Sequence, residues 1–442
     1  MEKVKVGFIS LGCPKNQVDT EVMLSLLHEA GYELTGEDIE ADIIIVNTCA
    51  FIESAKRESI DSILDVAWLK KHRNLKGIVA CGCMAQRYAD EIERELPEVD
   101  AIVGTGSIHD IVKAVEAVAR GERFRSTKPN EQLRLGGDRI ITTPSYFAYL
   151  KIAEGCDNRC TYCAIPLIRG SFRSRPIEEL VEEARVLESL GVKELALIAQ
   201  DTTRYGLDIY GEYRLAELIR KITAETTIPW IRLMYCYPDK ITDELVAEMR
   251  DNDRLLKYID LPIQHISDKI LSAMNRHGGS ETIRSAIKRL REAVPGIIIR
   301  STAIVGFPGE TRADFGELCE FIKEARFDRF GAFTYSREEG TPAYSMTGQV
   351  SEKEKQRRLD RLMAIQLDIH EENNRALIGR TLKVLCEGYD AAAGIYFGRS
   401  YADAPEIDGK VFFTSDRRLS EGEFIDVEIS EAVDYDLRGK KV

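Results

Sequence analysis

The chain has 442 residues, of which 44% are hydrophobic and 31% are charged. This composition indicates a globular protein with two to four domains. No apolar run is long enough for a membrane helix, and the first residues lack the cleavage site of a signal peptide, so we expect a cytoplasmic protein with no membrane partner. The net charge of −13 disfavours a general nucleic-acid binder, which needs a basic surface against phosphate.

Apolar runs alternate with helical patterns through residues 1–120. Alternating strands and helices predict a parallel sheet with helices on both faces, and ligands of such sheets bind at the carboxyl ends of the strands. Residues 121–145 are polar with little periodicity, which predicts a linker. The predicted strands of this first segment lie at 4–11, 43–47, 77–81 and 101–104.

Six further strand–helix units follow between residues 146 and 375. Six units are two fewer than in an eightfold barrel, so we expect a partial (β/α)6 TIM-like barrel that ends in a long charged helix at 351–375. In residues 376–442, short strands between Gly, Asp and Pro turns predict a small antiparallel β-barrel. The fold class is therefore multidomain α/β with a terminal β-barrel. The barrel strands are predicted at 147–153, 194–200, 230–235, 258–263, 297–305 and 329–335.

The sharpest chemical motif is AEGCDNRCTYCAIP, which places Cys156, Cys160 and Cys163 just after the first barrel strand. Three thiolates can hold a 4Fe–4S cluster and leave one iron without a protein ligand. The amine and carboxylate of S-adenosylmethionine (SAM) can chelate that iron, and an electron from the cluster can then cleave SAM to a radical. A structural zinc site is disfavoured, because it needs a fourth ligand and no Cys or His stands nearby.

A second set of cysteines follows the strands predicted in the first segment. The stretches SLGCPKN, VNTCAF and ACGCMAQ place Cys13, Cys49 and Cys83 in loops that should open on one edge of the sheet. They predict a second 4Fe–4S cluster with an open iron. The alternative is three separate buried thiols, since cysteine is common in protein cores. Cys83 is preferred to Cys81 because it lies in the loop after Gly82. No role is assigned to Cys81, Cys236, Cys319 and Cys386.

Polar residues and glycines end several barrel strands, where function is often located. An equally open alternative is that they are ordinary turn residues, and His265 is expected to be structural. Arg169, Arg173 and Arg175 could bind the SAM carboxylate or the substrate, or could simply be solvated. The chemistry is expected from the two clusters rather than from acid or base side chains. The candidate SAM contacts are Tyr162, Gln200, Asp201, Gln264 and Gly306.

Together these motifs resemble the methylthiotransferase family of radical SAM enzymes over essentially the whole chain. The resemblance assigns a cluster to each cysteine triad, and the aromatic side chain of Tyr162 before the last cysteine matches the superfamily pattern. It also implies an amino-terminal methylthiotransferase domain, a radical SAM domain and an OB-like TRAM domain. These correspond to residues 1–120, 146–375 and 376–442.

Within the family, SLGCPKNQVDTE, LIAQDTTRYGLD and YADAPEIDG resemble members that modify an aspartate of the twelfth small-subunit ribosomal protein. This resemblance implies a 3-methylthioaspartate product and two SAM molecules per turnover, one cleaved and one donating its methyl group. It also implies the ribosomal protein as substrate, an electron donor such as flavodoxin or ferredoxin, and a sulfur donor. We expect a monomer.

Two other functions remain open. A sibling activity on isopentenyladenosine of transfer RNA would favour a basic terminal domain that contacts phosphate. Residues 376–442 instead carry 9 basic and 13 acidic side chains, a net charge of −4, which suits a basic ribosomal protein. The other function is a non-catalytic iron–sulfur carrier, which would need four thiolates for each cluster.

Overall fold

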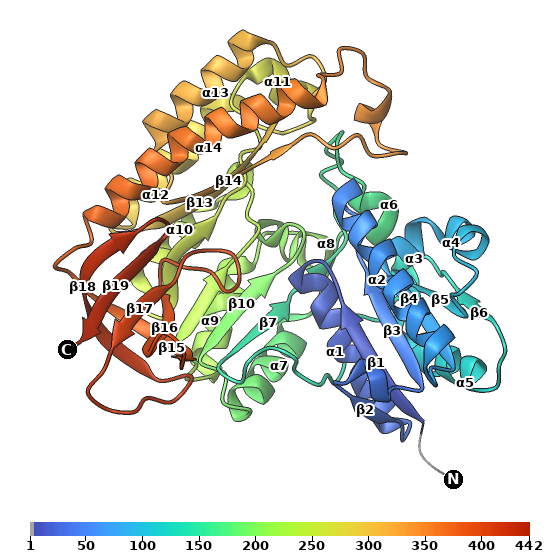
Figure 1. Ribbon diagram of the computed structural model, residues 1–442. Coiled ribbons are helices and arrows are strands. Elements are labelled where there is room, and N and C mark those ends of the chain that lie inside the picture. The colour runs from blue at the N-terminus through green and yellow to red at the C-terminus, as the bar shows by residue number, and fades with distance from the viewer. Residues whose placement is uncertain (1–3) are drawn as a thin grey trace.

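In the computed structural model, which describes residues 4–442, the amino-terminal region forms a parallel sheet of six strands (Figure 1). Its order is β2-β1-β3-β4-β5-β6, and the four inner strands match the prediction. The two edge strands were not predicted, and β6 lies inside the segment expected to be a linker. The bounds are β1 Lys5–Ser10, β2 Glu33–Thr35, β3 Ile43–Thr48, β4 Gly77–Gly82, β5 Ala101–Gly104 and β6 Phe124–Ser126.

Helices cover both faces of this sheet because its central strands are apolar on both sides. Ile43 and Ile45 pack under one pair of helices, while Ile44 and Val46 pack under the helices of the opposite face. This alternation follows from the two-residue period of a strand. The first face carries α1 Pro14–Glu29 and α5 Ile111–Ala119, and the second carries α2 Glu53–His72, α3 Cys83–Arg87 and α4 Ala89–Glu95.

The central region is a second parallel sheet, in the order β14-β13-β12-β11-β10-β7. All six strands are those predicted, and among residues 4–442 β7 and β14 remain the two edges, which confirms a partial barrel. The strands are β7 Phe147–Lys151, β10 Glu194–Ile198, β11 Trp230–Leu233, β12 Leu255–Asp260, β13 Ile298–Val305 and β14 Arg329–Thr334.

The helices of the central region pack on one face of its sheet, where they bury a large apolar core. The long predicted helix is present as α14 and packs against α13 and β14 (Figure 1). In the described residues, no helix combines the length and apolar character needed to cross a bilayer. The helices are α7 Ile177–Ser189, α8 Leu207–Tyr210, α9 Leu215–Glu225, α10 Asp243–Asp251, α11 Asp268–Ala273, α12 Gly279–Ala293, α13 Arg312–Ala325 and α14 Glu352–Arg375.

A long loop follows β7 and is closed by two short strands. β8 (Ala153–Glu154) pairs antiparallel with β9 (Arg173–Ser174), and the short helix α6 (Ile165–Arg169) lies between them in the chain. The pairing fixes both ends of this loop. It contains Cys156, Cys160 and Cys163, so this cysteine triplet lies at the carboxyl end of the first barrel strand.

The carboxyl-terminal region is a closed five-stranded barrel in the order β15-β16-β17-β19-β18. It is antiparallel except where β17 runs parallel to β19, and β19 was not predicted. Closure leaves no strand edge free to pair with another chain. The strands are β15 Thr381–Asp390, β16 Ile395–Ser400, β17 Val411–Thr414, β18 Phe424–Val433 and β19 Asp436–Lys441.

This small barrel covers the face of the central sheet that the helices leave free. Tyr149 and Tyr258 of the sheet share an apolar cluster with Leu385 and Ala404 of the carboxyl-terminal region. Glu194, at the start of β10, is fully buried and pairs with two arginines. These are Arg232 of β11 at 2.6 Å and Arg399 of β16 at 2.8 Å.

Candidate functional site

The amino-terminal cysteines lie at one edge of the first sheet. Cys13 precedes α1, Cys49 directly follows β3, and Cys83 begins α3 directly after β4. Because β1, β3 and β4 are parallel neighbours, their three loops open side by side. A Cβ atom placed on Gly12 would lie only 3.2 Å from the Cys49 Sγ, so the Cys13 and Cys49 loops are in close contact. Cys81, in contrast, lies fully buried inside β4.

Two buried cations act on this triad. Burial opposes ionisation of Cys13, but Lys15, Arg169 and backbone N–H groups outweigh it, so the pKa of the Cys13 thiol is lowered. Burial raises the pKa of Cys83 to about 12 although Arg169 opposes it. The Lys15 ammonium itself lies 3.3 Å from the ring centre of Tyr235 in the central region, where the attraction between cation and aromatic ring favours its charged form.

The second triad is largely buried in the loop after β7. The Asn158 side chain donates to Cys156 Sγ at 3.5 Å, and the Tyr237 hydroxyl lies 3.9 Å from Cys160 Sγ. Burial raises the pKa of Cys156 to about 11 and also raises the pKa of Cys163. The guanidinium of Arg276 stacks 4.2 Å from the Tyr237 ring centre, which places a cation beside these thiols.

Two of the candidate SAM contacts have buried acceptors available. The amide oxygens of Gln200 and Gln264 are buried, and no hydrogen bond reaches them from residues 4–442. Gln264 adopts a φ of +69°, which is uncommon for a residue with a side chain and often marks a functional site. A buried amide oxygen without a donor is costly, so both positions fit a polar ligand.

The other candidate contacts are held by their neighbours. The Asp201 carboxylate accepts from Asn158 at 2.8 Å and lies 3.2 Å from Lys240, so it orders the loop that carries the second triad. Tyr162 packs in an apolar cluster with Phe307. Gly306 has a φ of +75°, and its N–H donates to Glu310.

Of the three arginines after the second triad, Arg169 and Arg175 are buried and Arg173 is half-buried. Arg175 pairs with Glu183 at 2.6 Å, and Arg173 donates to the Leu133 carbonyl at 2.7 Å. Arg169 is 2% exposed and bonds the Asp19 and Glu154 carboxylates at 2.6 and 3.1 Å. Arg169 and Arg175 are therefore neutralised by carboxylates, whereas Arg173 has no carboxylate partner among residues 4–442 and two of its guanidinium nitrogens lack an acceptor there.

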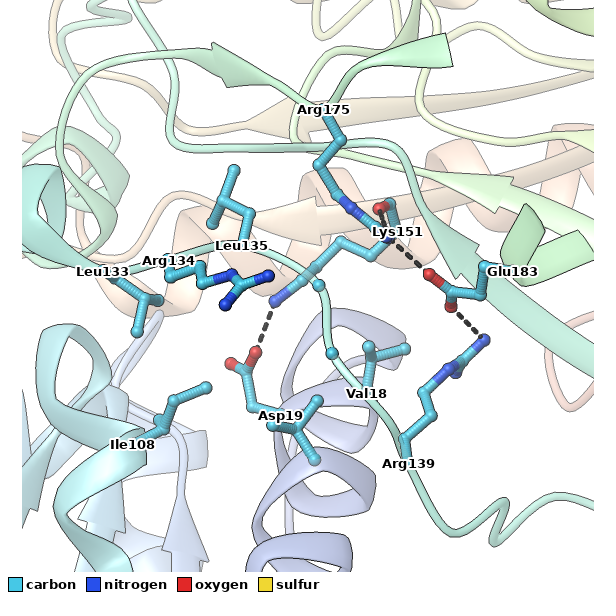
Figure 2. Close-up of a pocket in the computed structure, with 13 residues that line it drawn as sticks. Val18, Asp19, Ile108, Leu133, Arg134, Leu135, Arg139, Lys151, Arg175 and Glu183 are labelled. Atoms are coloured by element: carbon cyan, nitrogen blue, oxygen red, sulfur yellow. Dashed lines mark hydrogen bonds and ion pairs between the residues drawn. The ribbon is translucent and has the colours of Figure 1, made fainter. Parts of the chain in front are cut away.

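The boundary between the first two regions contains a small cavity of about 20 Å³, enough for roughly one water molecule. Figure 2 shows that it is surrounded by ion pairs, among them Lys151 with Asp19 and Arg139 with Glu183. This space is too small for SAM or for a protein side chain. It belongs to the interface and not to the reactive site.

The residues around both triads fit iron–sulfur clusters. Among residues 4–442, no three Cys, His, Asp or Glu side chains are grouped to hold a single metal ion. A cubane needs more widely spaced thiolates than one zinc ion does, together with cations or N–H donors near the sulfurs. Such groups are present at Cys13, Cys83 and Cys156. Lys15, Tyr235, Asn158 and Arg276 were not identified from the sequence, because the contacts that distinguish them join distant segments.

Three family models match consecutive parts of the chain. An uncharacterised protein family designated UPF0004 matches residues 5–104, the radical SAM superfamily matches 150–322, and the TRAM domain matches 378–442. The structure of the radical SAM methyltransferase TsrM from Kitasatospora setae has a TM-score of 0.57 at 16% identity, over 78% of this chain and 77% of that chain. This likeness shows a shared fold.

Relatives named ribosomal protein uS12 methylthiotransferase RimO align over nearly the full chain. The protein from Thermoanaerobacter sp. is 49% identical over 98% of this chain and 99% of its own. The Desulforamulus reducens protein is 50% identical over 98% and 99%, and the Clostridioides difficile protein is 49% identical over 99% and 98%. With this identity over both full lengths, and with the radical SAM and TRAM matches in the same order, the chain belongs to the RimO family of radical SAM methylthiotransferases.

Proposed function

We propose that this chain transfers a methylthio group to the β-carbon of an aspartate of ribosomal protein uS12. The relatives that share about half of its residues are named as methylthiotransferases of ribosomal protein uS12. The observation that carries the proposal is the presence of two separate cysteine triads, each at the carboxyl ends of a parallel sheet. One triad suits radical formation, and the other suits sulfur delivery.

The two triads would each hold one 4Fe–4S cluster, Cys13, Cys49 and Cys83 the first and Cys156, Cys160 and Cys163 the second. When bound, these groups supply the electron that cleaves SAM and an open iron at which sulfur can be held. Lys15 and Arg169 compensate thiolate charge at the first triad. At the second triad, Arg276 supplies the positive charge and Asn158 donates a hydrogen bond to Cys156.

The protein also orients SAM and keeps water away from the second triad. We assign SAM contacts to Gln200 and Gln264, whose amide oxygens can accept from its amine or ribose hydroxyls, and to the Gly306 backbone. Tyr162 lies on an apolar wall with Met274, Phe307 and Tyr335, all three of which are buried. Such a wall protects a carbon radical from side reactions. Asp201 acts indirectly by fixing Asn158.

We further assign residues 1–120 to sulfur delivery, 146–375 to radical formation and 376–442 to substrate binding, with 121–145 as the connection. The acidic charge of 376–442 supports a basic protein substrate. The reaction needs a low-potential electron donor such as flavodoxin or ferredoxin, and a sulfur donor. A ribosomal substrate places the enzyme in the cytoplasm.

The test is anaerobic reconstitution followed by product analysis. The full chain should bind about eight irons, as two cubanes require. With SAM and a reductant it should add one methylthio group to uS12, located on an aspartate by tandem mass spectrometry. Transfer RNA carrying isopentenyladenosine is the parallel substrate and should stay unmodified. Modification of the RNA alone would overturn the assigned substrate, and iron bound without SAM cleavage would indicate a carrier.

A further inference from the structure

Arg169 connects the two triads physically. It ends α6, the helix that begins just after Cys163, and its side chain reaches into the first region. One guanidinium nitrogen donates to Cys83 Sγ at 3.4 Å and to the Asn16 side-chain oxygen at 3.1 Å. The helix itself also packs against the first region, because its residue Ile168 lies in a small buried cluster with Cys83.

The charge of Arg169 is already balanced without the thiol. Its other terminal nitrogen donates to Asp19 and Glu154, and Lys151 bonds the same two carboxylates. Two cations and two carboxylates therefore form a neutral buried group. Both carboxylates are bonded by one terminal nitrogen, so the N–H groups of the second terminal nitrogen are left to donate to Asn16 and Cys83.

The same group extends to the second triad. The free oxygen of Glu154 accepts from the Gln200 amide at 2.8 Å and from the Gly155 N–H at 3.2 Å. Gly155 directly precedes Cys156. The hydrogen bonds from Cys83 through Arg169 and Glu154 therefore end beside the first ligand of the second triad.

We propose that Arg169 is a positioning residue that donates a hydrogen bond to the Cys83 sulfur and raises the reduction potential of the cluster held there. The proposal rests on the proposed function, since it requires a cluster on Cys83. A reduced cluster carries one more negative charge than an oxidised one. A cationic donor at a ligand sulfur stabilises that added charge, and burial strengthens the effect because the dielectric constant is low.

The reduction potential of the first cluster can be measured alone in a full-length background that carries Cys156→Ala, Cys160→Ala and Cys163→Ala. Redox titration monitored by electron paramagnetic resonance gives the fraction reduced at each potential. We expect Arg169→Gln to lower the reduced-to-oxidised ratio about tenfold at a fixed potential, which is about 59 mV for a one-electron couple. Arg169→Lys keeps the charge but loses the forked geometry, so it should give a smaller shift in the same direction.

Arg139→Gln is the matched control. Arg139 is a buried arginine at the same boundary, bonded to Glu21 and Glu183, and no hydrogen bond in residues 4–442 joins it to a thiol. Its variant should lose comparable thermal stability without any change in potential. A merely structural Arg169 would behave in the same way.

The outcomes separate the two proposals. The parent here is the chain with Cys156, Cys160 and Cys163 replaced by alanine. If this parent does not bind about four irons after reconstitution, the proposed function is refuted, and this inference with it. A normal cluster whose potential is the same in the parent and Arg169→Gln would refute the inference alone. If Arg169→Gln cannot be purified folded, Arg169→Lys decides, and a potential equal to the parent value overturns the role of Arg169.

Discussion

The hydroxyl of Tyr258 in β12 donates a hydrogen bond of 2.7 Å to Asp408, which lies between β16 and β17 of the terminal barrel. Asp408 also lies 3.5 Å from Arg300, whose main partner is Asp260 at 2.8 Å. A residue of the carboxyl-terminal region thus completes a polar group on the central sheet. The central sheet and the carboxyl-terminal region are therefore joined by a buried interface.

Asp408→Ala should destabilise the protein because it leaves the Tyr258 hydroxyl buried without its acceptor and removes a carboxylate that pairs with Arg300. Breaking a buried pair from one side costs about 3 kcal/mol. The apparent melting temperature of the full chain measures the loss. Asp416→Ala, at an exposed position of the same region, is the control and should melt like the parent. Equal melting of both variants would show that the Asp408 contacts contribute nothing.

Cys156→Ala and Cys13→Ala should separate the two halves of the reaction. Loss of Cys156 removes a ligand from the triad that suits SAM binding, so formation of 5′-deoxyadenosine should fall to background. Loss of Cys13 affects only the other triad, so some SAM cleavage should remain while methylthiolation stops. Both products can be measured by mass spectrometry in one reaction. Full product from Cys13→Ala would contradict the proposed division of roles.

In the metal-free chain Cys13 should react with iodoacetamide faster than Cys83. The thiolate is the reactive species, and the pKa of Cys13 is lowered whereas that of Cys83 is about 12. Cys13 is also partly exposed and Cys83 is buried. Peptide mapping at neutral pH measures both rates. Lys15→Gln should slow the alkylation of Cys13, because it removes a nearby cation that favours the thiolate. An unchanged rate of alkylation would show that Lys15 does not activate Cys13.

His265 should make the fold sensitive to acid. Burial lowers the pKa of His265 to about 4 from 6.5, and its Nδ1 accepts from the Ser267 N–H at 3.0 Å. At pH values between about 4 and 6.5, His265 binds more protons in the unfolded chain than in the folded one. The free energy of unfolding therefore falls as the pH falls. The loss is about 2 kcal/mol at a pH of about 5.

His265→Gln removes this titration and should flatten the dependence of melting temperature on pH across that range. His28→Gln, at an exposed position on α1, should keep the parent dependence. If His265→Gln follows the parent curve, the acid sensitivity comes from other groups.

The sequence predicts the inner strands of both parallel sheets because buried strands form continuous apolar runs between turns. It does not predict β2 and β6, which have three residues each and lie at sheet edges, where a periodic pattern cannot develop. It also misses β19, whose residues DLRGKK are mostly charged. That strand is stabilised by its pairing with β17 and β18.

In the candidate site too, local features could be predicted from the sequence and contacts between distant segments could not. Cys156, Cys160 and Cys163 lie within one loop, so their spacing alone indicates a shared ligand. The surroundings of Arg169 could not be predicted, because Asp19 and Cys83 belong to another region of the chain. The sequence could therefore suggest a solvated or ligand-binding arginine, whereas packing between the regions buries it in an ion-pair group.

The buried Glu194, shared between Arg232 and Arg399, has a consequence for substrate selection. Moving the terminal barrel away would separate Arg399 from Glu194 and break a buried ion pair, which is strongly destabilising, so the barrel stays fixed on the central sheet. A protein gripped by that barrel would be anchored at a constant distance from the reacting atoms. One aspartate among many chemically identical ones would then be chosen by its separation from the anchoring point.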